Sequence, residues 1–180
     1  MPSLYLVLLM MESIAAPHSK SLRIAILATD GVDSDTLLAV RSALRDRGIS
    51  SLIIGCRHGA LRSAQGTHIE IDQMLADEDC AKYDGVFIPG GCGIDLLCED
   101  KTTINFVLDS YKNGKIVASS VGGEKLVIKA AQTAKMPNGA FVGEGVISQS
   151  DNDSHFIKRF LVALTDIQSV KRPDIELMKI

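Results

Sequence analysis

Residues 22–55 read LRIAILATDGVDSDTLLAVRSALRDRGISSLIIG, and this stretch decides the fold class. Its first seven residues, LRIAILA, are a nearly continuous apolar run, as expected of a strand buried on both faces of a parallel sheet. An amphipathic helix is predicted from Asp33, with Gly48 as its end. Residues 51–55, SLIIG, are a second apolar strand. Strand, helix and strand in this order predict a parallel βαβ unit.

The rest of the chain continues the alternation of strands and helices. Further strands are predicted at residues 83–89, 115–119 and 145–147, with a small hairpin between residues 59 and 72. Further helices are predicted at residues 102–112, through Leu126, Val127 and Ala130, and at residues 153–164. We therefore expect an α/β protein with a flavodoxin-like, doubly wound, mostly parallel sheet and helices on both faces. The ligand crevice of such a sheet lies beyond the carboxyl ends of its strands.

Composition fits one hydrophobic core and disfavours a polyanionic partner. The chain has 180 residues, of which 46% are apolar, and a formal net charge of -3. Single domains usually have about 100 to 200 residues. We expect no nucleic-acid partner, because a slightly acidic chain does not attract phosphates. The four cysteines lack zinc-site spacing and disulfide density, which favours reduced thiols, a cytoplasmic location and no metal or other cofactor.

The first 21 residues are predicted to lie outside the domain proper. Residues 4–11, LYLVLLMM, are uninterrupted apolar sequence, but a helix that spans a bilayer needs about 20 such residues. No lysine or arginine precedes this run, as it would in a signal peptide. We therefore interpret residues 1–21 as an apolar segment and linker, and residues 22–180 as the domain, with no membrane association.

The loop Ser119-Ser120-Val121-Gly122-Gly123 lies between a predicted strand and a predicted helix. A nucleophile can be raised toward helix amides at such a turn, and His155 is a candidate base for Ser120. The motif Gly-x-Ser-x-Gly is absent, because Ala118 stands two residues before Ser120. The alternative is that both serines satisfy backbone groups and cap the helix, while His155 is a surface residue. We favour this alternative.

Two other loops complete the predicted crevice. The amides of Gly90 and Gly91 could form an oxyanion hole, or these glycines could only permit a tight turn. Cys92 could be a reactive thiolate, although no histidine partner is evident in the sequence. Asp33 could act as a general acid or metal ligand, but capping of the following helix explains an acidic residue at this position with fewer assumptions. The predicted crevice residues are Asp33, Gly90, Gly91, Cys92, Ser119 and Ser120.

At these loops the chain resembles the ThiJ/PfpI superfamily, which is related to class I glutamine amidotransferases. Residues 86–91, VFIPGG, match the family's strand ending in Pro-Gly-Gly, and residues 118–122, ASSVG, fall on its elbow, usually Ala-x-Cys-His-Gly. The resemblance puts Ser120 at the position of the nucleophilic cysteine and Val121 at that of the histidine. The family's acid, usually glutamate, falls on Thr36. These three replacements argue against the family's deglycase, glyoxalase and protease activities.

Within the superfamily, the chain most resembles the C-terminal domain of large-subunit catalases. Residues 25–33, 66–72, 143–147 and 156–164 carry this likeness. It implies a non-catalytic role in peroxide defence under oxidative stress, by stabilisation, oligomerisation or chaperone-like action. The partner would be a second copy of the chain or a haem catalase core, and the domain could be either a stand-alone chain or part of a longer catalase. The alternatives are a Ser120-dependent hydrolase or acyl-transfer enzyme and a redox or ligand sensor at Cys92.

Overall fold

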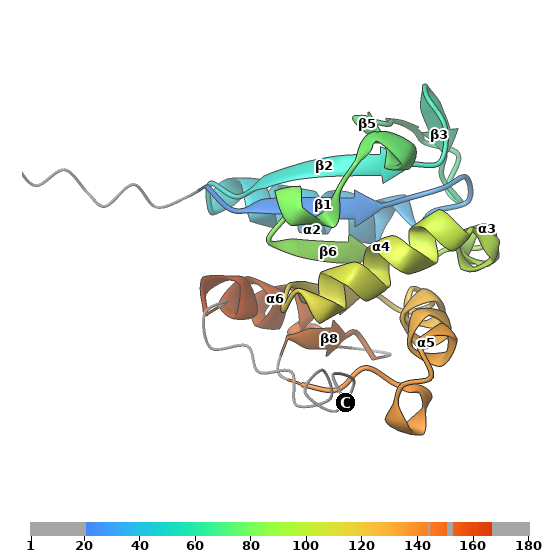
Figure 1. Cartoon of the computed structure of the whole chain (residues 1–180). Coiled ribbons are helices and arrows are strands. Elements are labelled where there is room, and N and C mark those ends of the chain that lie inside the picture. Colours follow the sequence, from blue (N-terminus) through green and yellow to red (C-terminus); the bar gives the residue numbers. More distant parts are fainter. Residues whose placement is uncertain (1–20, 144, 151–152, 167–180) are drawn as a thin grey trace, which may run out of the picture.

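A computed structural model describes residues 21–143, 145–150 and 153–166, and shows a parallel sheet between two helical layers (Figure 1). The sheet has six strands in the order β5-β2-β1-β6-β7-β8, and every pair of neighbours is parallel. A separate antiparallel hairpin is formed by β3 and β4. This is a flavodoxin-like α/β fold, so the predicted fold class is confirmed.

The strands are short and central, and the helices follow them in turn. The strands are β1 (Arg23–Leu27), β2 (Ser50–Gly55), β3 (Ala60–Arg62), β4 (His68–Glu70), β5 (Gln73–Met74), β6 (Gly85–Ile88), β7 (Ile116–Ser119) and β8 (Val146–Ser148). The α-helices are α2 (Ser34–Asp46), α3 (Ile94–Glu99), α4 (Lys101–Lys112), α5 (Glu124–Thr133) and α6 (Phe156–Thr165). Single 3-10 turns are η1 (Leu75–Asp77), η2 (Cys80–Lys82) and η3 (Pro137–Gly139).

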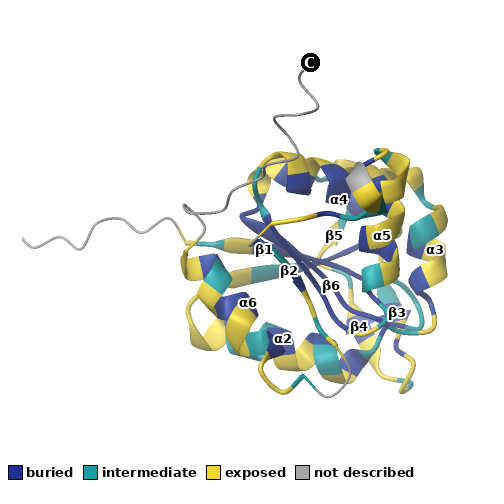
Figure 2. Cartoon of the chain, turned by 90° about the horizontal axis from the view of Figure 1, so that it is seen from below, coloured by how far each residue is buried: buried dark blue, intermediate teal, exposed yellow. Residues whose placement is uncertain are grey.

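Each face of the sheet packs against its own helical layer. Alternate residues of a strand point to opposite faces, so Ala25 and Leu27 of β1 join one core while Ile24 and Ile26 join the other. The first core includes residues of α3, α4 and α5, and the second includes residues of α2 and α6. Figure 2 shows the buried strands between helices whose outer surfaces are exposed.

The observed elements differ from the sequence prediction mainly at their ends. The last helix was predicted from residue 153 but begins at Phe156, because Asp153 binds the backbone amide of His155 and residues 154–155 form a turn. The edge strand β5 and helix α3 were not predicted, since both are too short to show an apolar period. Among the described residues, no helix has the length and apolar character needed to cross a membrane.

The β3–β4 hairpin is fixed to the sheet by one acidic side chain and two backbone bonds. Asp30 Oδ1 accepts a hydrogen bond from the Arg62 amide (2.8 Å), and its Oδ2 binds Arg57 Nη2 (2.6 Å). The Gly31 amide donates to the Arg62 carbonyl (2.7 Å), and the Ala64 amide donates to the Val32 carbonyl (2.8 Å). The hairpin therefore lies directly against the loop that follows β1.

Phe160 provides a test of the core beneath α6. Its ring is fully buried and lies 6.0 Å from the Phe87 ring of β6. We expect Phe160→Ala to lower the free energy of unfolding by about 3 to 5 kcal/mol, because it removes buried apolar area and leaves a cavity. Val162→Ala, on the exposed side of the same helix, should change it by about 0.5 kcal/mol or less. Urea denaturation measures both, and equal losses would contradict this packing.

Candidate functional site

The candidate site lies where the loops after β1, β6 and β7 meet at the carboxyl edge of the sheet. The Asp33 amide donates to the Gly90 carbonyl (2.9 Å), and Val32 forms an isolated antiparallel bridge with Gly91. The Gly90 amide donates to Ser120 Oγ (2.8 Å). The fold thus brings predicted crevice residues from three loops into one hydrogen-bonded junction. We call this set of loops, residues 29–33, 89–93 and 119–123, the loop junction.

Glycines allow the backbones of the loop junction to touch. A Cβ atom on Gly90 would overlap the Val121 carbonyl oxygen, and one on Gly93 would overlap the Asp30 carbonyl oxygen. A Cβ on Gly123 would likewise overlap the carbonyl oxygen of Ile88. Only residues without a side chain permit such an approach. The gap beneath the loops after β1 and β6 is too small to admit a water molecule, so these two loops are closed against each other at the edge where parallel sheets commonly have a ligand crevice.

Ser120 is a buried hydrogen-bond acceptor within the loop junction. Its exposed fraction is 2%, its Oγ accepts from the Gly90 amide, and its own amide donates to the Ile88 carbonyl (3.0 Å). Among the described non-glycine residues only Lys135 and Asn138 have positive φ, so Ser120 is not held on the strained turn of a nucleophile elbow. The same contact occupies the Gly90 amide, which is one of the two donors predicted for an oxyanion hole.

The other two polar candidates after β7 face elsewhere. Ser119 is buried at the end of β7, and its Oγ donates to Ser148 Oγ of β8 (3.1 Å). His155 is exposed before α6, with its Nδ1 3.2 Å from Ser154 Oγ. No hydrogen bond among the described residues joins His155 to Ser120. Ser119 therefore ties two strands together, and the imidazole makes its described contact within its own turn.

Asp33 is the N-cap of α2 and the centre of a small polar network. Its Oδ1 accepts from the Asp35 amide (3.1 Å) and from Gln65 Nε2 (2.8 Å), and its Oδ2 accepts from Thr36 Oγ1 (2.5 Å). Partial burial raises the pKa of Asp33, but the hydrogen bonds from Thr36, Gln65 and Asp35 outweigh it, so the net pKa lies below the ordinary 3.8. A carboxylate that stays ionised in this way is a structural cap.

The cysteines are dispersed, and the described ones are free thiols. Cys92 is exposed at the start of the turn before α3, and its Sγ donates to the Gly31 carbonyl (3.5 Å). Burial raises the pKa of the Cys56, Cys80 and Cys98 thiols, which disfavours their thiolates. Within the described ranges, no three His, Cys, Asp or Glu residues are placed to hold a metal ion.

Residues 22–136 match the DJ-1/PfpI family, and the match covers the sheet up to β7 together with the whole loop junction. The chain belongs to the DJ-1/PfpI family. It is 25% identical to Catalase-2 of Bacillus subtilis over 144 residues. These aligned residues make up 79% of this chain and 20% of that protein. This is a weak similarity to a catalase C-terminal domain. The chain therefore spans only about a fifth of the length of that relative.

Other DJ-1/PfpI relatives are closer to this chain in length. Deglycase TK1284 of Thermococcus kodakarensis is 20% identical over 109 residues, which cover 61% of this chain and 66% of that protein. The ThiJ/PfpI domain protein of Brachyspira murdochii superposes with a TM-score of 0.69 at 16% identity, over 81% of this chain and 97% of that chain. A two-domain protein of Anabaena variabilis, with DJ-1/ThiJ/PfpI-like and ferritin-like domains, superposes with a TM-score of 0.70 at 21% identity. The superposition covers 80% of this chain and 48% of that chain. These structures share the DJ-1/PfpI fold.

Sequence reasoning missed two residues near the loop junction. Gln65, at the tip of the β3–β4 hairpin, binds Asp33 with its Nε2 and accepts from both the amide and the Oγ of Ser34 (3.0 and 2.9 Å). Glu124 begins α5, and its Oε2 is buried without a hydrogen-bond partner. Gln65 is distant in sequence from both of its partners, so no local pattern indicates the contact.

Gly90→Ala tests the closure of the loop junction. Gly90 lacks a positive φ, so only the overlap with the Val121 carbonyl opposes a methyl group there. We expect a loss of about 3 kcal/mol or more in the free energy of unfolding, at the upper end of overpacking costs. The control is Gly48→Ala, which has a φ of 69° but open space around it and should cost only about 1 kcal/mol. A milder effect at Gly90 than at Gly48 would show that the loops can separate.

Asp33 provides a test by pH. Its carboxylate stabilises the fold above the ordinary carboxyl pKa of 3.8, and this contribution is lost as pH falls through the lower folded-state pKa. We expect wild type to be more stable than Asp33→Asn by about 0.5 to 2 kcal/mol near neutral pH. The difference should shrink when urea denaturation is repeated at about pH 3. Asp35→Asn is the matched control, and a pH-independent difference for Asp33→Asn would refute the capping role.

Proposed function

We propose that this DJ-1/PfpI chain is a non-catalytic domain that stabilises a haem catalase or a similar assembly in peroxide defence. The observation that carries the proposal is the hydrogen bond from the Gly90 amide to the buried Ser120 Oγ. It uses the nucleophile position and one of the two candidate oxyanion donors, the Gly90 amide, for structure, so these groups are not free to bind a substrate carbonyl. The weak similarity to catalase C-terminal domains supports the choice of partner.

The chemistry of other family members needs groups that this site does not assemble. A serine hydroxyl becomes nucleophilic only with a base in hydrogen-bond reach, and the described partner of Ser120 Oγ is a backbone donor. Val121 stands at the position where the resemblance expects histidine, and its carbonyl closes the loop junction over Gly90. Thr36, at the acid position, donates to the Asp33 carboxylate. These three contacts support a structural role for the residues at the family's catalytic positions.

A first experiment tests the absence of catalysis and the role of Ser120 together. We expect wild type and Ser120→Ala to show only background esterase, glyoxalase and deglycase turnover. Ser120→Ala should also lower the free energy of unfolding by about 1 to 3 kcal/mol, because it leaves the buried Gly90 amide unpaired. Ser50→Ala, at an exposed strand end, is the control for serine removal. Turnover that Ser120→Ala abolishes would overturn the proposal and establish an enzyme.

A second experiment tests the partner. The half-life of a large-subunit catalase that lacks its own C-terminal domain is measured in peroxide at elevated temperature, once with this chain added and once without it. We expect the chain to extend the half-life of activity by about twofold or more, because binding to the folded form opposes unfolding. Ser120→Ala protein that remains folded should protect equally, since protection needs no turnover. Absence of protection at a saturating concentration of this chain would refute the catalase partner. It would not affect the conclusion on catalysis from the first experiment.

A further inference from the structure

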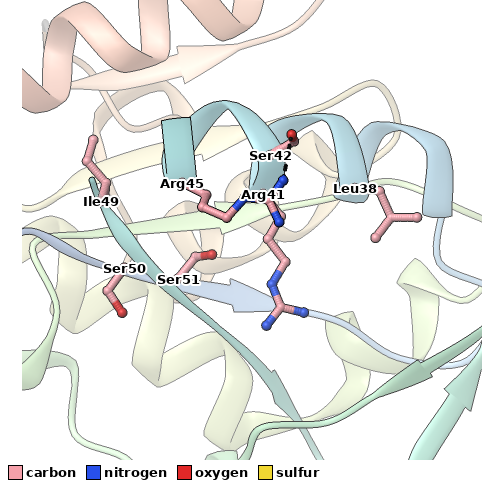
Figure 3. A pocket seen from close by; sticks show the side chains of 7 residues that line it. All are labelled: Leu38, Arg41, Ser42, Arg45, Ile49, Ser50 and Ser51. Carbon is pink, nitrogen blue, oxygen red and sulfur yellow. Dashed lines mark hydrogen bonds between the residues drawn. The ribbon is translucent and has the colours of Figure 1, made fainter. Parts of the chain in front are cut away.

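A second surface feature lies at the opposite end of the sheet from the loop junction. It is a groove of about 520 Å³ between the outer side of α2 and the amino-terminal half of β2 (Figure 3). We call it the α2–β2 groove, and it is lined by Leu38, Arg41, Ser42, Arg45, Ile49, Ser50 and Ser51. None of these residues takes part in the contacts of the loop junction, so the groove is a separate feature of the fold.

Within the described part of the chain, no strand pairs with the amino-terminal half of β2 on the side of this groove. The outermost strand, β5, pairs with β2 only at Ile54 and Gly55, and Asp72 binds the amide and the carbonyl of Ile53 (2.8 and 2.9 Å). The Ser50 amide donates to the Leu22 carbonyl on the β1 side, so the alternation of the strand turns the Ser51 amide and carbonyl outward. β5 does not extend to Ser51. Such outward main-chain groups are a template for an added strand.

The charge of the groove is positive. Among the described residues that line it, the charged side chains are Arg41 and Arg45, and none is a carboxylate. Arg41 Nη2 binds Asp72 Oδ2 (3.1 Å), whereas the hydrogen bond described for Arg45 is a long one to Ser42 Oγ (3.5 Å). Arg45 is also exposed, and Figure 3 shows both arginines on the helix side of the groove. A guanidinium without a carboxylate partner favours an anionic ligand.

The spacing of the arginines fits a strand with acidic residues at alternate positions. Side chains four residues apart on a helix have Cβ atoms about 5 to 6 Å apart. Side chains two residues apart on a strand point to the same face and are about 6.6 Å apart. One carboxylate can therefore lie near Arg45, and the other near Arg41 beside its existing contact with Asp72, while the strand backbone pairs with Ser51. Leu38, which is 46% exposed, offers apolar contact at one end.

We propose that the α2–β2 groove binds an extended acidic peptide segment of a partner protein, which adds as a strand to the outer edge of β2. A peptide backbone supplies both a donor for the Ser51 carbonyl and an acceptor for the Ser51 amide. A fully deprotonated small anion such as sulfate could accept from the amide but has no hydrogen-bond donor for the carbonyl. Main-chain pairing provides affinity, and the two arginines select carboxylates at alternate positions.

The first test uses synthetic peptides and the full chain. The probe is Thr-Asp-Val-Asp-Val-Thr with blocked ends, and its affinity is measured by calorimetry at low salt. We expect about tenfold weaker binding when both aspartates become asparagine, because charge-assisted hydrogen bonds are lost. An isomer with adjacent aspartates should be weakened similarly, since adjacent strand residues point to opposite faces. Equal affinity for all three peptides, or no binding of the probe, would overturn the proposal.

The second test uses protein variants. Arg45→Glu should weaken binding of the probe by about tenfold or more, while Arg47→Glu, an equal charge change at an exposed residue outside the groove, should leave it unchanged. Equal losses in both variants would indicate general electrostatic attraction and refute a built groove. Hydrogen exchange of the Ser51 amide should slow when the probe binds, as main-chain pairing requires.

Two further measurements separate a strand from a simple anion. N-methylation of the probe's backbone removes donors without altering the protein, and we expect it to weaken binding by about tenfold or more. Inorganic phosphate should compete only weakly. If phosphate binds as tightly as the probe and depends equally on Arg45, the groove is a small-anion site and the peptide proposal fails. Binding that survives N-methylation would also exclude strand addition.

Discussion

The fold depends on the contact of backbone with backbone at the carboxyl edge of β1, β6 and β7. Gly90, Gly93 and Gly123 each lie where a Cβ atom would overlap a carbonyl oxygen of another segment. Because no side chain separates the loops, their amides and carbonyls bond directly, as between Asp33 and Gly90. The sheet and its helical layers are ordinary for their class, but this contact decides that the usual crevice is closed.

That closure gives a physical reason for a serine at the nucleophile position of this DJ-1/PfpI chain. A hydroxyl oxygen is small and accepts a hydrogen bond well, so Ser120 can satisfy the buried Gly90 amide. A thiol is a weaker acceptor, and a reactive one needs an electropositive, partly exposed site. Ser120 is 2% exposed and has no strained backbone. Its surroundings therefore suit a structural hydrogen bond.

The two ends of the sheet differ in how their polar groups are paired. At the carboxyl edge the hairpin β3–β4 is held by Asp30, and Gln65 at its tip extends the network that caps α2, so these polar side chains are paired within the chain. Toward the amino end, β5 is too short to cover β2, and Arg41 and Arg45 flank the uncovered edge. The groove that we propose to bind a peptide thus lies away from the family's catalytic position, which is consistent with the proposed role in association.

The sequence by itself determined the fold class, the mostly parallel character of the sheet and the three loops that converge. Apolar runs such as residues 22–28 and the helical spacing of Phe156, Phe160 and Leu164 are local patterns, and local patterns report which face of an element is buried. The Pro-Gly-Gly turn and the replaced elbow could also be recognised from residues alone. Short elements such as α3 and β5 could not be predicted, because they have too few residues to show a period.

Only the tertiary structure decided what the converging loops do. Gly90 and Gly91 are compatible with either an open oxyanion hole or a closed turn. Which of the two forms depends on how near the 119–123 loop lies to Gly90. The partner of Ser120 is thirty residues away, and that of Asp33 in the hairpin is thirty-two residues away. Hydrogen bonds between segments so far apart depend on how the sheet places its loops. A local sequence pattern does not indicate which residues from distant segments will form a hydrogen bond.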